Sequence, residues 1–371
     1  MKKWLRTLTM TAAAIVTLSA CGAGEEAPQT DGEAAPGGEE AVEATDFTVG
    51  MVTDVGGIDD KSFNQSSWEG LSAFGEEFGL TEGTDYRYLQ SGDMSEFEPN
   101  IRQLVREDVD LVWGIGFLME DAVRTIAEQV EDSQLAIVDS VVVDADGNTY
   151  PNVANITFKE HEGSFLVGVA AALQSNTNKV GFIGGVEGAL IKKFENGFKA
   201  GVKAVNPDAE IIVQYAESFN NPDRGSQIAN TMYSQGADII YHAAGDTGNG
   251  LFTEAINRAR NGEDVWAIGV DRDQHEEGAY GDGQSVTLTS MVKRVDTAVQ
   301  IVSERTMNGD FPGGEVLEYG LDDEAVGIAP TTDNMSEEAL QAVEDYKAQI
   351  QAGDISVPQS DEEYEDFLSS L

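Results

Sequence analysis

Glycine and aspartate recur at the positions where buried β-strands are predicted to end. Residues 54–64 follow the first such strand and contain Asp54, Asp59, Asp60 and Asn64. Similar residues follow the later strands, at 114–121, 139–141, 184–188, 245–246 and 271–272. In parallel sheets ligands bind outside the carboxyl ends of the strands. Carboxylates accept hydrogen bonds and repel anions, so this pattern predicts a site for a ligand that is not an anion.

The segment GGIDDKSFNQSSWEG, residues 56–70, leads from a glycine-rich loop directly into a helix. Ser62 is the candidate cap of that helix, which carries Trp68. Phe63 has two interpretations, because an aromatic residue at a helix start either packs into the core or stands in a cleft. Asp54 likewise either caps a turn or contacts a ligand. The segment alone leaves both questions open.

Motifs of common catalytic sites are absent from the sequence. Residues 184–192, GGVEGALIK, lack the spacing of a phosphate-binding Walker loop, and no G-x-S-x-G motif occurs. His161, His242 and His275 do not have the spacing of metal ligands. No set of nucleophile, base and orienting residue is recognisable. The sequence therefore predicts a protein that is not an enzyme and needs no metal or cofactor.

Short β-rich runs alternate with longer amphipathic runs along the chain. The predicted strands are 47–53, 111–115, 135–139, 179–183, 211–214, 238–242 and 265–270. Apolar residues recur at helical spacing between them. Such alternation is typical of parallel sheets covered on both faces by helices. Because the pattern runs through two successive sets, we predict an α/β protein with two doubly wound, Rossmann-like lobes and a ligand cleft between them.

The predicted boundaries divide the folded part, residues 46–371, into two lobes. Lobe 1 is expected to comprise about 46–157 and 285–325, and lobe 2 about 158–284, with crossings near 155–160 and near 284. The segment 326–371 is not assigned to either lobe. It contains a predicted helix, 337–352, with Ser336 as the cap and Gly353 as the stop.

The first 45 residues have the composition of an export signal and a tether. Lys2, Lys3 and Arg6 precede a short apolar run, which is too short to remain as a membrane span. Leu18-Ser19-Ala20-Cys21 resembles the lipobox of bacterial lipoproteins, which implies cleavage after residue 20 and lipid attachment at Cys21. This is the only cysteine, so no internal disulfide can form. Residues 21–45 contain few large apolar side chains and are predicted to be a flexible tether.

The formal net charge of the chain is −45 at pH 7. This charge argues against nucleic acids and anionic lipid surfaces as partners. The carboxylates are spread along the chain. Such a well-solvated surface is typical of a protein that works in high salt or an alkaline medium, where ions screen the repulsion.

Several motifs resemble one known family. Residues 52–71, VTDVGGIDDKSFNQSSWEGL, are similar to the opening signature of the basic membrane protein family, the substrate-binding lipoproteins of certain ABC transporters, and in particular to its purine nucleoside receptors. The likeness continues through WGIGFLMEDAV (113–123), VGFIGG (180–185), FENGFKAG (194–201), ESFNNPDRG (217–225), HAAGDTGNG (242–250), IGVDRDQ (268–274) and TSMVKRVD (289–296). It extends over essentially the whole folded part.

The resemblance implies a periplasmic-binding-type fold and roles for matching residues. Phe63 and Phe219 would sandwich a purine ring from opposite lobes. Three polar residues would bind near the base, and three others would hold the ribose: Asp54, Asn64 and Asp121 at the base, and Gly245, Asp271 and Lys293 at the ribose. Alternatively, Asp271 is a strand-end turn residue and Lys293 a surface lysine at a helix start. Whether Arg272 contacts ligand stays open.

The prediction is therefore an extracytoplasmic receptor, anchored in the cell membrane by lipid, that delivers a nucleoside to an ABC permease with its ATPase. Three alternatives remain. A protein of the same fold could bind a sugar, a riboflavin-like heterocycle or a signalling molecule. An enzyme could hydrolyse nucleosides, although no catalytic set is visible. A transcriptional sensor could use the same lobes, although it would need a DNA-binding helix pair.

Overall fold

The computed structural model describes residues 46–371, which belong to one compact unit. The predicted signal peptide, the predicted lipidation site Cys21 and the predicted tether lie outside the described residues. Within residues 46–371, no helix is long and apolar enough to cross a membrane.

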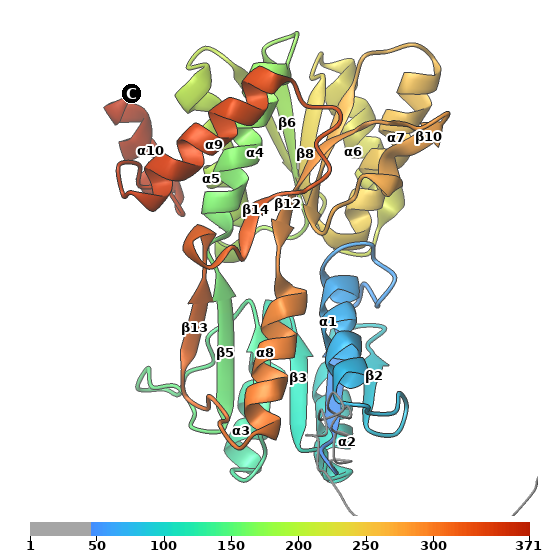
Figure 1. Cartoon of the computed structure of the whole chain (residues 1–371), viewed down its shortest axis with the longest axis vertical. Coiled ribbons are helices and arrows are strands. Elements are labelled where there is room, and N and C mark those ends of the chain that lie inside the picture. Colours follow the sequence, from blue (N-terminus) through green and yellow to red (C-terminus); the bar gives the residue numbers. More distant parts are fainter. Residues whose placement is uncertain (1–45) are drawn as a thin grey trace, which may run out of the picture. The chain divides into compact units, whose positions relative to one another are not determined.

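The first lobe is built on a six-stranded parallel sheet in the order β13-β5-β4-β3-β1-β2 (Figure 1). Its strands are β1 (Val49–Thr53), β2 (Tyr86–Gln90), β3 (Leu111–Ile115), β4 (Leu135–Val138), β5 (Val153–Phe158) and β13 (Val316–Tyr319). Its helices are α1 (Phe63–Glu77), α2 (Phe97–Arg106), α3 (Glu120–Gln129) and α8 (Val295–Met307), with short 3-10 turns η1 (Met94–Glu96) and η2 (Phe117–Met119). The central strands β1, β3 and β4 are buried throughout, as expected for a sheet covered on both faces.

The second lobe is built on another six-stranded sheet, in the order β14-β12-β9-β8-β6-β7, in which only β14 is antiparallel to its neighbour. Its strands are β6 (Lys179–Gly184), β7 (Glu210–Tyr215), β8 (Ile239–Ala243), β9 (Trp266–Asp271), β12 (Thr287–Lys293) and β14 (Val326–Ile328). Its helices are α4 (Glu160–Gln174), α5 (Ala189–Val205), α6 (Pro222–Ser234), α7 (Asn249–Arg260), α9 (Glu337–Gln351) and α10 (Asp361–Ser370). The hairpin β10 (Ala279–Gly281) and β11 (Gln284–Ser285) and the turns η3 (Gly245–Gly248), η4 (Glu276–Gly278) and η5 (Leu321–Asp323) complete it.

The two sheets share one strand order. Strands β1 and β2 of the first sheet take the positions of β6 and β7 in the second. Strands β3, β4, β5 and β13 take the positions of β8, β9, β12 and β14. Asp139, directly after β4, and Asp271, at the end of β9, therefore occupy equivalent positions. Both have a left-handed backbone, with φ of 66° and 65°. Aspartate is one of the few residue types other than glycine that tolerate this conformation.

The chain crosses between the sheets three times. It passes from β5 into α4 after Phe158, from β12 into α8 after Lys293, and from β13 through η5 to β14. The first crossing agrees with the expected position near 155–160. The second lies later than the expected position near 284, because the glycine-rich turn at 281–283 closes the β10–β11 hairpin and β12 still pairs with β9 in the second sheet.

The C-terminal segment, which the sequence left unassigned, packs on the second lobe. Helix α9 packs on α4, and its predicted cap is confirmed, since the Ser336 hydroxyl accepts a hydrogen bond from the Ala339 N–H. Helix α10 packs on α5, where Lys199 Nζ lies 4.1 Å from the centre of the Tyr364 ring. These helices appear in red in Figure 1.

Helices α4 and α5 pack closely against each other in the second lobe. A Cβ atom at Gly168 of α4 would lie 2.3 Å from the backbone oxygen of Phe198 in α5. The small side chains within residues 161–174 therefore allow the two helices to pack closely. This pair supports Glu160, the first residue of α4, at the crossing between the lobes.

Candidate functional site

A cavity lies between the carboxyl ends of the two sheets. Both lobes line it. Seven of the eight residues predicted to bind ligand are in its wall: Asp54, Phe63, Asn64, Phe219, Gly245, Asp271 and Lys293.

The structure does not bring Asp121 to this cavity. Its side chain is 94% exposed in the first turn of α3, where it pairs with Arg124. It lines a separate surface hollow beside α2. Leu118, two residues before α3, lines the cavity instead. The helix that follows turns Asp121 toward solvent.

The first turn of α1 is held by Asp60 rather than by Ser62. The Asp60 carboxylate accepts hydrogen bonds from the backbone N–H groups of Ser62, Asn64 and Gln65, at 2.9–3.1 Å. Ser62 makes no capping bond, so the prediction that it caps this helix is wrong. Its hydroxyl instead donates to Asp271 Oδ2 of the second lobe, at 2.5 Å.

Asn64 orients Asp54. The Asn64 side-chain nitrogen donates to Asp54 Oδ1 at 2.7 Å and to Asp60 Oδ2 at 3.0 Å, and its oxygen accepts from the Asp54 N–H at 3.2 Å. Both amide protons of Asn64 are therefore used within the protein. Asp54 Oδ1 also accepts from the Gly56 N–H. Asp54 Oδ2 has no hydrogen-bond partner among the described residues and is the oxygen of this group left to accept from a ligand.

Aromatic rings reach the cavity from both lobes. Phe63 lies at the first residue of α1, and Phe219 lies in the loop between β7 and α6; both are half-buried. Gly185 makes room for the second ring, because a Cβ atom there would lie 2.1 Å from the Phe219 ring. Phe117 of the first lobe meets Phe219 edge to face, with ring centres 6.1 Å apart. Aromatic surface from both lobes therefore lines the cavity.

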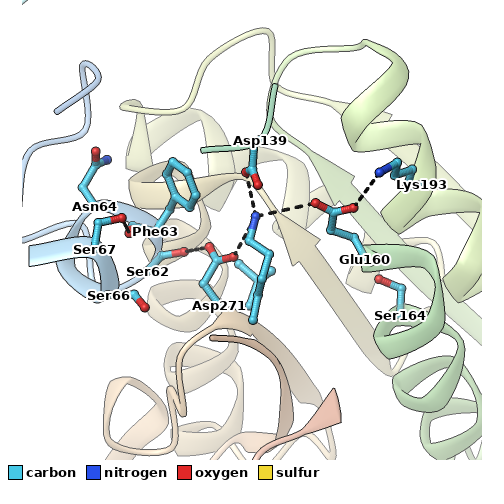
Figure 2. Close-up of polar contacts among 12 residues, drawn as sticks. Ser62, Phe63, Asn64, Ser66, Ser67, Asp139, Glu160, Ser164, Lys193 and Asp271 are labelled. Carbon is cyan, nitrogen blue, oxygen red and sulfur yellow. Dashed lines mark hydrogen bonds and ion pairs between the residues drawn. The ribbon is translucent and has the colours of Figure 1, made fainter. Parts of the chain in front are cut away.

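A buried lysine joins the two lobes at the base of the cavity. Lys293 Nζ lies 2.7 Å from Asp139 Oδ2, 3.7 Å from Asp271 Oδ1 and 3.9 Å from Glu160 Oε1. Figure 2 shows these three carboxylates converging, and Lys193 reaching Glu160 from the far side. The Lys293 side chain is only 2% exposed, so it is not the surface lysine that the sequence left as an alternative. Its ammonium also lies 4.7 Å from the centre of the Phe63 ring.

Burial and charge shift the pKa values of this cluster. Burial raises the pKa of Asp60 and Asp271 to about 6 and that of Glu160 to about 7, and it also raises the pKa of Asp54. Burial alone would lower the pKa of Lys293, but Asp139, Asp271 and Glu160 together raise it. Lys293 therefore stays protonated, and its ammonium group interacts with all three carboxylates.

Three residues of the site were not singled out by the sequence. Asp60, Phe117 and Asp139 all line the cavity. Asp139 appeared among the strand-end residues, but nothing local distinguished it from the others. Its Oδ1 is buried without a hydrogen-bond partner among the described residues, which leaves it available to a ligand donor.

Arg272 is not part of the cavity wall. Its guanidinium forms a two-pronged ion pair with Glu69 of α1, with distances of 2.7 and 3.0 Å. This pair joins the lobes at a partly exposed position. The geometry therefore gives Arg272 a contact between lobes.

The chemistry of the wall is that of a binding site for a neutral molecule with donor groups. Its carboxylates accept hydrogen bonds, and one lysine offsets part of their charge. That lysine is already enclosed by three carboxylates, so the described wall offers no cradle for a phosphate.

Residues 47–361 match the sequence profile of the Bmp family, described as ABC transporter substrate-binding protein PnrA-like. The chain belongs to this family. Relatives support the assignment. A Lactococcus lactis protein named ABC transporter nucleoside-binding protein BmpA is 40% identical over 321 residues, covering 85% of this chain and 90% of the relative. A Listeria innocua protein named CD4+ T-cell-stimulating antigen is 50% identical over 359 residues, covering 95% and 97%.

Solved structures agree with the PnrA-like fold. An ABC transporter solute-binding protein from Aeropyrum pernix superposes with a TM-score of 0.76 at 25% identity, covering 87% of this chain and 98% of that one. The predicted α/β fold with two Rossmann-like lobes is confirmed. The prediction that the protein is not an enzyme is also confirmed, because PnrA-like proteins are substrate-binding proteins. They are extracytoplasmic and work with a permease and an ATPase.

The buried Glu160 gives this PnrA-like protein a pH-dependent stability. Its pKa is raised from 4.5 to about 7, first by burial. Between these values the folded state binds the proton more tightly than the unfolded state, so stability is lost as pH rises through about 7. We expect the free energy of unfolding to fall from about pH 5 to about pH 8, and Glu160→Gln to flatten this slope.

Urea unfolding at fixed salt and several pH values would measure the effect. Glu276→Gln, at an exposed position in η4, is the matched control and should keep the wild-type slope. An unchanged slope in Glu160→Gln would contradict the assignment.

Proposed function

We propose that the protein binds purine nucleosides in the cavity between its lobes and delivers them to a membrane permease. The observation that carries the proposal is the composition of the cavity wall. Phe63 and Phe219 come from opposite lobes, and free acceptors of Asp54 and Asp139 lie in the same wall. A flat base carrying N–H groups, joined to a sugar carrying hydroxyls, suits such a wall.

Each part of a nucleoside has a matching group in the proposal. The base stacks on the aromatic rings, which contributes ~1–3 kcal/mol per base. Asp54 Oδ2, oriented by Asn64, accepts from an N–H of the base. Asp271 and Asp139 accept from ribose hydroxyls, and Lys293 donates to a sugar oxygen. The name of the Lactococcus relative, a nucleoside-binding protein, supports the same ligand class.

Ligand binding closes the lobes in this proposal. A ligand shifts an equilibrium between open and closed states only by its different affinity for the two states. Residues of both lobes line the cavity, so the closed state makes contacts that the open state cannot make. The chain is also proposed to be anchored through lipid at Cys21, which keeps it near its permease.

Isothermal titration in high salt tests the ligand class. The full chain would be titrated with adenosine, guanosine, inosine, uridine, ribose and riboflavin. Micromolar or tighter binding of purine nucleosides, with no response to ribose, is the expected result. If the folded protein gives no binding heat with any nucleoside, the proposal is overturned. Binding of ribose or riboflavin would favour a different ligand on the same fold.

Asp139 and Asp121 provide a direct comparison within the first lobe. Asp139→Asn should weaken binding by about tenfold or more, because a hydrogen bond to a charged acceptor contributes ~1.5–3 kcal/mol. Asp121→Asn should change affinity by less than about twofold, because its side chain lies outside the cavity. Titration of both variants with inosine gives the answer. The reverse order of effects would mean that the ligand binds elsewhere.

A further inference from the structure

Three consecutive residues of the first lobe contact the second lobe. We call residues 60–62 the docking segment. The Asp60 carbonyl accepts from Asn249 Nδ2 at 3.0 Å, and the Lys61 carbonyl accepts from Gln274 Nε2 at 2.9 Å. The Ser62 hydroxyl donates to Asp271. The segment ends directly before Phe63, so its position and that of the ring are coupled through one backbone.

The side-chain amide of Gln274 has a fixed orientation. Gln274 Oε1 lies 2.8 Å from the Val270 backbone nitrogen, and a backbone N–H can only donate, so this atom is the acceptor. His242 Nε2 lies 3.0 Å from the same oxygen and must therefore carry the ring proton. The remaining group of Gln274, its NH₂, is directed at the Lys61 carbonyl.

The surroundings of Gln274 belong to the second lobe. Its backbone N–H donates to Ser290 Oγ, and its carbonyl accepts from Thr287 Oγ1, both on β12. Gln274 is 1% exposed and His242 is fully buried. Burial lowers the pKa of His242 to about 4, so the ring is neutral and carries a single proton near neutral pH. The donor is therefore held in place before the lobes meet, and little side-chain order has to be gained on closure.

We propose that Gln274 is a positioning residue for lobe closure, which secures the docking segment in the closed state and thereby slows ligand release without touching the ligand. Gln274 does not line the cavity. Its contact with Lys61 forms only when the lobes meet. The effect on affinity should therefore appear in the dissociation rate, since encounter with the open protein does not involve this bond. The inference rests on the proposed function, because a nucleoside is the ligand whose release it slows.

Two variants of the full chain remove the hydrogen-bond donor of Gln274, one by adding a charge and the other without a charge. Gln274→Glu keeps an oxygen for Val270 and His242 but turns a second oxygen toward the Lys61 carbonyl. Gln274→Met removes the donor without adding charge, and it also removes the acceptor of Val270 and His242. The matched control is Gln284→Glu, at an exposed position of β11 in the same lobe.

Stopped-flow and titration with inosine, repeated with adenosine, give the first readout. Gln274→Met should raise the dissociation rate and Kd by about fivefold, and Gln274→Glu by more, with the association rate within about twofold of wild type. Gln284→Glu should match wild type. A dissociation rate of Gln274→Met within about twofold of wild type would overturn the inference.

Hydrogen exchange of the ligand-free chain gives a second readout that needs no nucleoside. The ligand-free chain exchanges between open and closed states, and Gln274→Met should spend less time closed. The amides of Ser62, Asn64 and Gln65, which bond to Asp60, should therefore exchange faster in Gln274→Met than in Gln284→Glu. The melting temperature of the ligand-free protein separates this effect from global unfolding. Equal exchange would count against the inference. Failure of the wild-type chain to bind either nucleoside would count against the proposed function alone, because the exchange comparison still decides the role of Gln274.

Discussion

Replacing Lys293 by methionine is expected to abolish nucleoside binding and to lower the free energy of unfolding by about 3–5 kcal/mol at about pH 8. The variant removes the cation that lies among Asp139, Asp271 and Glu160, all of them buried. Of these three, Glu160 also pairs with Lys193. Breaking a buried ion pair in this way leaves uncompensated charge in a region of low polarity. The same change removes the donor assigned to the sugar.

The loss of stability in Lys293→Met should itself depend on pH. Without the lysine the pKa values of Asp271 and Glu160 rise further, because a positive charge that opposes the effect of burial is removed. Their protonated forms then stabilise the folded state, and this contribution is lost as pH rises through the raised pKa values. The difference in the free energy of unfolding between wild type and Lys293→Met should therefore become smaller toward about pH 5.

Chemical unfolding of wild type and Lys293→Met at both pH values measures these effects. Lys347→Met, a half-buried lysine of α9 on the outer face of the second lobe, is the matched control. Its cost should stay below about 1 kcal/mol. If Lys293→Met lowers the free energy of unfolding by no more than the control does, the cluster does not depend on this cation.

The aromatic rings give the second large effect. Phe63→Ala and Phe219→Ala should each weaken nucleoside binding by about tenfold or more, because loss of one stacked ring removes ~1–3 kcal/mol. Phe63 also faces the Lys293 ammonium, so its removal should have the larger effect on the arrangement of the site. Titration with inosine and thermal unfolding of the ligand-free variants measure both consequences.

Phe311→Ala controls for the loss of a half-buried ring in the first lobe away from the cavity. It should leave affinity unchanged. If Phe63→Ala and Phe219→Ala both bind inosine as tightly as wild type, base stacking on these rings is excluded.

Much of this architecture can be predicted from the sequence, because the sequence patterns that indicate it are local. Alternating strands and amphipathic helices predict the two sheets, and glycine with aspartate after each strand marks the edge where the cavity lies. The segment around Phe63 leaves its role open, and the resemblance to the family signature implies a place in the wall. Ser336 predicts the start of α9. Each of these signals depends on residues within a few positions of one another.

The rest depends on contacts between distant residues. Ser62 and Asp60 are both suitable helix caps, and only the bond from Ser62 to Asp271, 209 positions away, shows why the aspartate takes that role. Lys293 and Asp139 are 154 positions apart, so no local pattern pairs them. The second crossing was placed too early because strand β12 is recognised by its partner β9 rather than by its own sequence.

The shared strand order of the two sheets has a meaning for the ancestry of the site. Asp139 and Asp271 lie at equivalent strand ends, turn through nearly the same backbone angle and face the same lysine. Tandem duplication of one half-sized gene would place both carboxylates in the protein as copies of a single ancestral strand-end residue. Lys293 has no such counterpart, since the equivalent strand β5 ends in Phe158. One later substitution in one copy would then have been enough to turn two repelling acids into a centre that holds both halves together.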